Sequence, residues 1–243
     1  MKKKRLDVCV QELHPELSRS HIQSLIMQGK VIVNNEKITK SGAAIAPDAV
    51  ITVDVSQEKF VSRAGYKLEH ALKVFDIDVT GLTVMDAGLS TGGFSDCLIQ
   101  HGVRKIYGID VGYGQVHEKI RNDSHVIVME RTNLRQVRDL GVLVDLVTLD
   151  LSFISVLKVM DAVDAILKPD GKLVVLIKPQ FEARPDQVGR GGIIKDSNVH
   201  EEVIQNVTHG IIERGYKLQG VIESPILGGE GNKEFLAYFI RGA

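Results

Sequence analysis

Two charged residues of opposite sign end two successive apolar strands in the second half of the sequence. Asp150 ends an expected strand at 145–150, and Lys178 ends one at 171–178. Ligands of open α/β sheets bind at the carboxyl ends of the strands, so both side chains are aimed at one crevice. A buried Lys is costly unless it is paired, so one interpretation is a structural Asp150–Lys178 ion pair. The other is a lysine kept partly neutral by desolvation or by a neighbouring cation, which then acts as a base.

A second cation and a second carboxylate are available for the same crevice. Lys67 lies on the helix that precedes the first strand of the expected sheet, and Glu234 starts the final strand. Acid–base chemistry on a bound ligand needs such groups within hydrogen-bond reach of the reacting proton. No group of His, Cys, Asp and Glu residues has the spacing of metal ligands, so we expect no metal.

A glycine-rich turn joins the first expected strand, 82–87, to a helix at 93–101. Gly88 lets the chain turn tightly, and Gly92 with Gly93 lets a ligand approach the backbone at a helix N-terminus. The turn matches neither a dinucleotide fingerprint nor a P-loop. Asp86 suits a zwitterionic ligand with an ammonium group better than a phosphate. An ordinary strand–helix turn is the alternative to a small-molecule site. The candidate ligand contacts are Asp86, Gly88, Ser90, Thr91, Gly92, Gly93 and Phe94.

A further carboxylate, Asp110, lies near the end of the next expected strand, 105–111. It follows Asp86 by about two dozen residues, close to the spacing of ribose-binding acids in dinucleotide sites. A carboxylate there can accept hydrogen bonds from both hydroxyl groups of a ribose. Thr132 and Asn133, after the strand at 125–130, are candidate contacts to an adenine ring, with an ordinary turn as the alternative.

These residues are positioned by strands and helices that alternate from Val61 onward. Strands separated by helix-length segments predict a doubly wound, mostly parallel α/β sheet. The last two strands are separated only by Pro225 to Lys233, so we expect an antiparallel pair at the end of the sheet. The expected strands are 82–87, 105–111, 125–130, 145–150, 171–178, 217–224 and 234–240, and the expected helices lie near 63–75, 93–101, 155–167 and 198–214.

The N-terminal end reads as a separate basic module. Residues 1–40 carry eight Lys or Arg against four Asp or Glu, in a chain whose net charge is -1. A helix capped near Ser18 and ending at Gly29 precedes short strands at 31–33 and 51–55, which predicts a compact α+β module. We place this domain at residues 1–55, a linker at 56–61 and the larger domain at 62–243.

Composition excludes several classes of protein. With 44% hydrophobic and 25% charged residues, the 243-residue chain has the balance of a soluble globular protein. The near-zero net charge excludes a uniformly basic nucleic-acid coat. Two distant cysteines, Cys9 and Cys97, exclude a disulfide framework and favour a reducing compartment. The absence of a signal peptide core and of a membrane-length apolar run favours a cytoplasmic location.

Several of these motifs together resemble one family. The motifs are Ser62–Leu68, Asp86–Phe94, Asp150–Ser155 and Ile177–Glu182, and they are similar to those of the TlyA family of rRNA 2′-O-methyltransferases, historically labelled hemolysins. The resemblance implies a Rossmann-like class I methyltransferase sheet of FtsJ type that binds S-adenosylmethionine. Residues 3–60 resemble the alpha-L RNA-binding motif. Leu89 stands where family members often have a small residue, which would narrow the cofactor loop.

The resemblance also implies roles for individual residues. The Lys-Asp-Lys-Glu tetrad of the family falls on Lys67, Asp150, Lys178 and Glu234. We expect Lys178 to act as general base, and Lys67 to support it and to stabilise the oxygen. Asp150 would orient Lys178 and also contact the cofactor, near its sulfonium. Glu234 would fix either Lys67 or the ribose. The expected reaction is methylation of a ribose 2′-oxygen, of cytidine in small- or large-subunit rRNA, with S-adenosylmethionine as donor.

The expected partner is rRNA or a ribosomal subunit, with no membrane and no obligatory oligomer. With 5% aromatic residues and no Trp, recognition by shape and backbone fits better than an aromatic platform for single strands. Two alternatives remain open: an RNA-binding assembly factor with little catalysis, and a membrane-active hemolysin. The candidate RNA contacts are Lys3, Lys4, Arg5, Arg19, His21, Lys30, Lys40 and Arg63.

Overall fold

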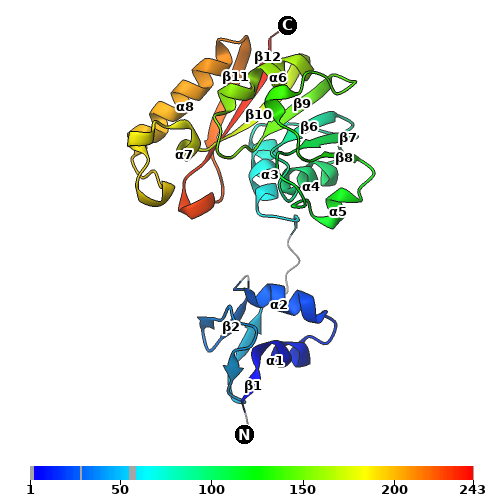
Figure 1. Ribbon diagram of the computed structural model, residues 1–243, viewed down its shortest axis with the longest axis vertical. Helices are drawn as coiled ribbons and strands as arrows, with labels where there is room; N and C mark the ends of the chain where they lie inside the picture. Colours follow the sequence, from blue (N-terminus) through cyan, green and yellow to red (C-terminus); the bar gives the residue numbers. More distant parts are fainter. Residues whose placement is uncertain (1–2, 28, 55–58, 243) are drawn as a thin grey trace. The chain divides into compact units, whose positions relative to one another are not determined.

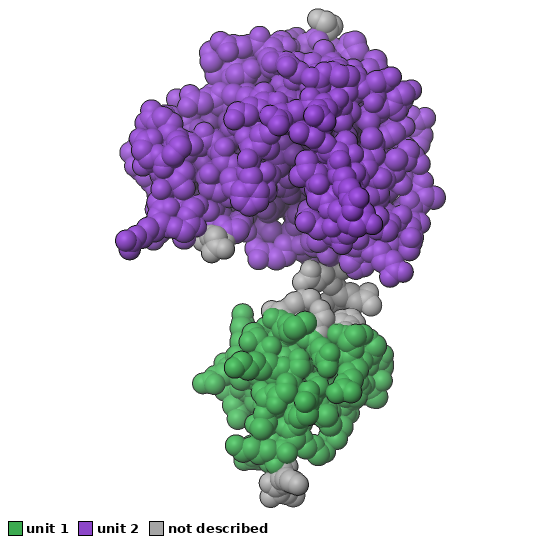
Figure 2. Space-filling view, in the orientation of Figure 1, with its two compact units in different colours: residues 1–58 green, residues 59–243 purple. Residues whose placement is uncertain are grey.

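The computed structural model describes residues 3–27, 29–54 and 59–242. The chain divides into two compact units, residues 1–58 (unit 1) and 59–243 (unit 2), which Figure 2 colours separately. Of the predicted linker, residues 56–58 lie outside the described part. Residues 59–61 belong to unit 2, because Phe60 is buried in its core and the Val61 amide donates to Asp96 Oδ2 at 2.7 Å.

Unit 1 is a small α+β module, as predicted. Its two helices bury Leu6, Val10 and Ile22 against strand residues such as Val31 and Ile45. The central strand β2 pairs antiparallel with β3 and β5, and β1 pairs with β4. The elements are β1 (Lys4–Arg5), α1 (Leu6–Leu13), α2 (Arg19–Met27), β2 (Val31–Val33), β3 (Glu36–Lys37), β4 (Ala44–Ile45) and β5 (Ile51–Val53).

Unit 2 contains a seven-stranded sheet in the order β11-β12-β10-β9-β6-β7-β8 (Figure 1). The five strands from β10 to β8 run parallel, whereas β12 runs antiparallel to both of its neighbours. The predicted pairing of the last two strands is confirmed, but β12 lies inside the sheet, beside β10. The strands are β6 (Thr83–Ala87), β7 (Lys105–Ile109), β8 (Val126–Met129), β9 (Val144–Leu149), β10 (Leu167–Ile177), β11 (Tyr216–Glu223) and β12 (Phe235–Arg241).

Helices cover both faces of this sheet. They are α3 (Ala64–Val74), α4 (Gly93–Gln100), α5 (Glu118–Arg121), α6 (Met160–Ile166), α7 (Pro179–Glu182) and α8 (Ser197–Ile212). Short 3₁₀ turns are η1 (Leu134–Gln136), η2 (Val156–Val159), η3 (Pro185–Gln187), η4 (Arg190–Gly192) and η5 (Gly229–Gly231). The helix expected at 155–167 is therefore η2 followed by α6.

Alternate strand residues face opposite helical layers. Met85 and Val175 pack in the cluster that α6 and α8 cover, while Val84 and Val174 pack in the one that α3, α4 and α5 cover. A strand that is buried on both faces needs apolar residues at every position, which explains the unbroken run in β10. Each fully buried Val or Leu side chain contributes about 1.5–3 kcal/mol. Packing in the two core layers therefore fixes the position along the sheet at which each strand ends.

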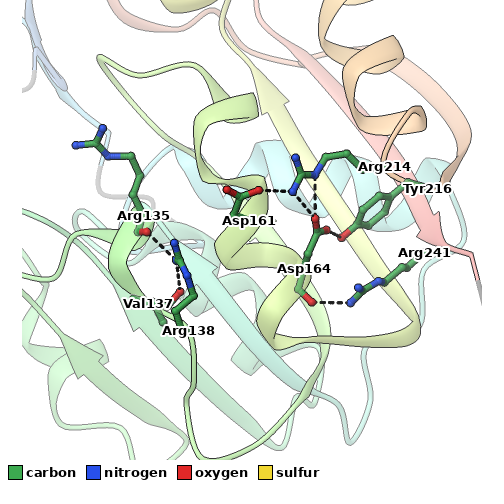
Figure 3. A network of polar contacts seen from close by, with 8 residues as sticks. All are labelled: Arg135, Val137, Arg138, Asp161, Asp164, Arg214, Tyr216 and Arg241. Atoms are coloured by element: carbon green, nitrogen blue, oxygen red, sulfur yellow. Dashed lines mark hydrogen bonds and ion pairs between the residues drawn. The ribbon is translucent and has the colours of Figure 1, made fainter.

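A network of arginine and aspartate side chains surrounds the amino-terminal end of β10 (Figure 3). The Arg214 Nε and Tyr216 hydroxyl groups donate to the two oxygens of Asp164, at 2.8 and 2.7 Å. Arg241 donates to the carbonyl oxygens of Asp164 and Leu167. These contacts join the α6–β10 junction to the start of β11 and the end of β12. They lie at the edge of the sheet opposite the carboxyl end of β10.

Two glycines allow close packing around the start of α3. A Cβ atom at Gly65 would lie 2.3 Å from Phe60 Cγ, and one at Gly93 would lie 2.2 Å from Ser62 Oγ. Real Cβ contacts are essentially never this short, so a side chain at Gly93 would push α4 away from the start of α3, and one at Gly65 would displace Phe60. Gly93 thereby keeps α3, which carries Lys67, close to the glycine-rich turn that precedes α4.

We expect Gly65→Ala to lower the free energy of unfolding by about 1–3 kcal/mol, because overpacking a well-packed core costs that much. At an open helix position the same change stabilises by up to ~1 kcal/mol, so the sign is diagnostic. Urea unfolding followed by circular dichroism measures it. Gly229→Ala, where no atom lies within 4 Å of the added carbon, is the control. An unchanged or higher stability of Gly65→Ala would contradict the close contact between α3 and Phe60.

Candidate active site

The strand register brings three of the four tetrad residues to one edge of the sheet. Val175 of β10 pairs with Leu149 of β9 in parallel, and Ile177 pairs with Phe235 of β12 in antiparallel register. Asp150, Lys178 and Glu234 are the residues directly beyond these pairs. They therefore lie at the ends of three adjacent strands.

The first charge pair of the site joins Lys178 to Asp150. The Lys178 Nζ lies 2.6 Å from Asp150 Oδ1 and 3.1 Å from Ser152 Oγ. Both charged side chains are mostly buried. Low local dielectric strengthens such a pair and fixes its geometry. The structure thus contains the ion pair that the sequence left as one of two interpretations.

The second charge pair joins Lys67 of α3 to Glu234, 2.5 Å apart and almost wholly buried. Gly228 lies against the same carboxylate, since a Cβ atom there would be 1.9 Å from Glu234 Oε1. Glu234 therefore fixes Lys67, one of the two roles that the sequence left open. The formal charges of the two lysines and the two carboxylates sum to zero. The site can therefore bury two amines without burying a net charge.

A pocket of about 350 Å³ opens beside the first pair, since Asp150 is one of its lining residues. Its volume lies in the usual range for small-molecule sites. A cavity of about 70 Å³ lies under the glycine-rich turn, lined in part by Thr91, Gly93 and Phe94. Gly88, Ser90 and Asp150 line both spaces, so the two adjoin at the turn. The larger pocket is lined by Gly88, Ser90, Ile109, Asp110, Val111, Gly112, Gln115, Thr132, Asn133, Leu134, Asp150, Leu151, Ser152, Phe153, Ile154 and Val159.

Asp110 is held in this pocket by the backbone. The amides of Ser90 and Gly112 donate to its two carboxylate oxygens, each at 2.7 Å. An ionised carboxylate has about four acceptor positions, so two remain for hydroxyl groups of a ligand. Thr132 and Asn133 line the pocket nearby, and Asn133 Oδ1 also accepts the Arg135 amide at the start of η1. This set fits a ribose with an adjoining ring.

Gly88 brings the turn into direct contact with Asp150. Its φ is +87°, and a Cβ atom would lie 2.1 Å from the Asp150 carbonyl oxygen. Only glycine fits this position, because both the backbone conformation and the space exclude a side chain. The bare backbone forms a cradle in which a ligand can approach the main chain closely. Gly92, also left-handed, faces Ile120 and lines neither space.

The expected direct contact from Asp86 to an ammonium group is not available in this structure. Asp86 has no exposed surface, and its oxygens accept hydrogen bonds from Ser95 Oγ at 2.6 Å and Thr148 Oγ1 at 3.0 Å. Burial raises its pKa to about 6, although both hydroxyl groups act in the opposite direction. Asp86 therefore supports the turn from below by joining β6, β9 and α4. Its strand-end position was readable from the sequence, but its two hydroxyl partners were not.

Leu89 does not line the larger pocket, but it is one of the residues around the smaller cavity at the glycine-rich turn. Its side chain is buried, and its methyl groups lie over Gly108 of β7, where a Cβ atom would come within 2.8 Å of Leu89 Cδ2. The larger residue is thus accommodated by a glycine on the neighbouring strand. The expected narrowing of the cofactor loop therefore stays a prediction for the smaller cavity.

One residue that the sequence did not single out is Phe153. It is 90% exposed, has a φ of +65°, and its ring lies 4.9 Å from that of Phe181 in α7. A non-glycine residue in the left-handed region marks a constrained functional segment more often than chance. The signal available from the sequence was a bulky aromatic residue directly after Ser152, in a strand-end loop.

The candidate RNA contacts divide between the two units. In unit 1, Lys3, Lys4, Arg5, Arg19 and Lys40 are exposed, Lys30 is half-buried, and the His21 side chain lies outside the described part. In unit 2, Arg63 is exposed at the start of α3 and donates to the Leu227 carbonyl oxygen at 3.0 Å. Among the described side chains, no three His, Cys, Asp or Glu residues are grouped to hold a metal. No helix in the described ranges is long and apolar enough to span a membrane.

Comparisons with known proteins agree with this architecture. A family described as FtsJ-like methyltransferase matches residues 60–241, and the S4 domain matches residues 4–51. Over 239 residues the chain is 40% identical to Hemolysin A of Brachyspira hyodysenteriae, covering 97% of this chain and 99% of the relative. Over 224 residues it is 39% identical to the 16S/23S rRNA (cytidine-2′-O)-methyltransferase TlyA of Mycobacterium tuberculosis, covering 91% and 84%.

A solved structure gives the same result for the whole fold. A protein from Streptococcus thermophilus that is labelled a hemolysin matches with a TM-score of 0.77 at 36% identity, covering 100% of this chain and 90% of that one. The predicted fold class and the predicted family resemblance are both confirmed. With an S4 domain followed by an FtsJ-like methyltransferase domain, the chain belongs to the TlyA family.

Proposed function

We propose that this protein transfers a methyl group from S-adenosylmethionine to a ribose 2′-oxygen of rRNA, at a cytidine. The observation that carries the proposal is the Lys178–Asp150 pair at 2.6 Å, beside a pocket that Asp150 itself lines. Relatives named as rRNA (cytidine-2′-O)-methyltransferases support the reaction class and the acceptor. The S4 domain supports RNA as the partner.

The pocket residues fit the cofactor. Asp110 has acceptor positions for the two ribose hydroxyl groups, and Thr132 with Asn133 would face the adenine side. The Gly88 cradle leaves room for the amino-acid part against bare backbone. When bound, S-adenosylmethionine supplies an electrophilic methyl group on a sulfonium. Because Asp150 lines both the pocket and the cavity, it stands between the cofactor side and Lys178.

Lys178 is the base in this proposal. The ribose 2′-hydroxyl is a weak acid, and its proton must leave as its oxygen forms the bond to the methyl carbon. Lys178 Nζ accepts that proton once its own extra proton has passed to solvent. Asp150 and Ser152 hold the amine in one place, at 2.6 and 3.1 Å. Since the displacement is in line, this positioning supplies much of the rate.

Lys67 stabilises the developing charge. As the 2′-oxygen loses its proton it gains negative charge, and a fixed ammonium group in a site with little water lowers the energy of that state. Glu234 keeps Lys67 in position, and Gly228 allows the carboxylate its place. The exposed ring of Phe153 at the pocket provides a surface on which the base of the target nucleotide can stack.

We expect Lys178→Ala to reduce methyl transfer at least about 100-fold, because general base catalysis contributes about 10²–10⁴. The assay is transfer of radiolabel from methyl-labelled S-adenosylmethionine to ribosomal subunits that lack the native modification, followed by digestion to nucleosides. Cofactor binding should persist. Lys172→Ala, in the middle of β10, is the control and should retain activity. Full transfer by Lys178→Ala, or label on a base instead of a ribose, would contradict the proposal.

We expect Asp110→Asn to weaken the binding of S-adenosylmethionine about tenfold. Hydrogen bonds to a charged acceptor contribute about 1.5–3 kcal/mol, and the amide keeps only part of that capacity. Isothermal titration calorimetry measures the affinity. Asp139→Asn is a matched control, since that exposed carboxylate also accepts a backbone amide, from Gly141. If both variants bind equally well, Asp110 does not hold the ribose.

A further inference from the structure

Unit 1 contains a carboxylate that is buried in a basic setting. Asp7, in the first turn of α1, has a side chain that is only 1% exposed. It lies in the stretch of residues 1–40 where positive charges outnumber negative ones by eight to four. A buried carboxylate costs free energy unless it is paired and hydrogen-bonded. Its partners therefore explain why it is there.

Two arginines approach this one carboxylate. Arg5 binds it in a bidentate manner, with Nε 2.9 Å from Oδ1 and Nη2 2.8 Å from Oδ2. Arg19 Nη2 approaches the same Oδ2 at 3.7 Å. The Val8 amide donates to Oδ1 at 3.1 Å. The hydrogen bond from Arg5 is the main cause that lowers the pKa of Asp7 to about 2, so the carboxylate stays charged at neutral pH.

The backbone restrains the same group of residues. Arg5 pairs with Ala44 between β1 and β4, and the Asp7 amide donates to the Ser41 carbonyl oxygen at 3.0 Å. Gly42 lies against the guanidinium, since a Cβ atom there would be 3.7 Å from Arg5 Cζ. The Arg5 side chain is thus held between the carboxylate and the turn that follows Lys40.

Both arginines still face solvent. Their side chains are 55% and 71% exposed, so donors not used by Asp7 remain open on the surface. A guanidinium carries five N–H donors, and Asp7 takes two from Arg5. The three residues have a net charge of +1. Two guanidinium groups that meet at one oxygen lie within reach of a single tetrahedral anion, and a phosphate matches the fork geometry of each.

We propose that Asp7 is a positioning residue for RNA binding, which holds Arg5 and Arg19 together as one site for a backbone phosphate group. The inference rests on rRNA being the partner, as proposed above. Fixing a long side chain on binding costs about 0.5–1.5 kcal/mol, and Asp7 removes part of that cost for two arginines in advance. It also offsets the repulsion between the two cations before the phosphate arrives.

The direction in which Asp7→Asn changes the affinity for RNA distinguishes a positioning role of Asp7 from a simple effect of its charge. Asp7→Asn removes a negative charge from a basic surface, so electrostatic attraction alone predicts tighter RNA binding. Positioning predicts weaker binding, because the amide cannot hold both guanidinium groups. Glu12→Gln is the matched control. Glu12 pairs with Lys4 at 2.8 Å, but the Glu12 side chain is 56% exposed whereas that of Asp7 is 1% exposed, so the same loss of charge removes a solvated carboxylate instead of a buried anchor.

The test is filter binding of the full chain to radiolabelled 16S and 23S rRNA transcripts at several salt concentrations. For the transcript that the unaltered protein binds more tightly, we expect Asp7→Asn to weaken binding about tenfold, which corresponds to about 1.4 kcal/mol. The slope of log affinity against log salt concentration should become less steep by about one unit, as expected for the loss of one phosphate contact. Glu12→Gln should bind as tightly as the unaltered protein or slightly more tightly.

Two further variants distinguish positioning from a general loss of structure. In an Arg5→Ala background, Asp7→Asn should cost much less additional affinity, since the residue it positions is gone. If thermal unfolding shows that Asp7→Asn does not fold, Arg5→Lys serves instead, because it keeps the charge but loses the bidentate fork and should weaken binding similarly.

Three results would overturn the inference. Binding by folded Asp7→Asn that equals or exceeds that of the unaltered protein would refute positioning alone and leave rRNA as the partner. Arg5→Lys that binds as tightly as the unaltered protein would do the same. Failure of the unaltered protein to bind either transcript would overturn both this inference and the assignment of rRNA as the partner.

Discussion

Two ion pairs at the carboxyl edge of the sheet impose the main constraint on unit 2. Lys178–Asp150 and Lys67–Glu234 place four charges where little water reaches them. Removing one member of a buried pair typically lowers the free energy of unfolding by about 3–5 kcal/mol. Each partner must therefore lie at the position along the sheet where it meets the other. Strand register sets that position for three of the residues, and the glycine contact between α3 and α4 sets it for Lys67. The far-edge network around Asp164 fixes the other end of the same strands.

Carboxylates in this protein do different work according to the donors that surround them. Asp86 accepts from two hydroxyl groups and joins three elements below the turn. Asp110 accepts from two backbone amides and keeps acceptor capacity facing the pocket. Asp7 accepts from the Arg5 guanidinium group, which stays exposed. The residue type is the same in all three cases, and the kind of donor decides whether the group supports the fold, faces a ligand or orders a surface.

Much of this arrangement was predictable because hydrophobic periodicity determines where strands end. The strands that precede Asp150 and Lys178 are buried on both faces, so their apolar runs and their charged ends were visible in the sequence. Partners across long separations were not. Nothing local pairs Lys67 with Glu234, 167 positions apart, or places hydroxyl groups of Ser95 and Thr148 around Asp86. The position of β12 beside β10 likewise depends on tertiary packing, because the short connection to β11 is compatible with either order.

The contact between Gly88 and the Asp150 carbonyl oxygen has a consequence for altering donor selectivity. With 2.1 Å separating that oxygen from the place of a Cβ atom, the turn and the strand-end acid move as one body. Enlarging the pocket by shifting the turn would therefore displace the acid and misalign the amine that it orients. Room for a bulkier sulfonium is better sought at Ile154 and Val159, which also line the pocket and take no part in that contact. In this fold, the side of the pocket that is richest in glycine is the one with the least freedom to be redesigned.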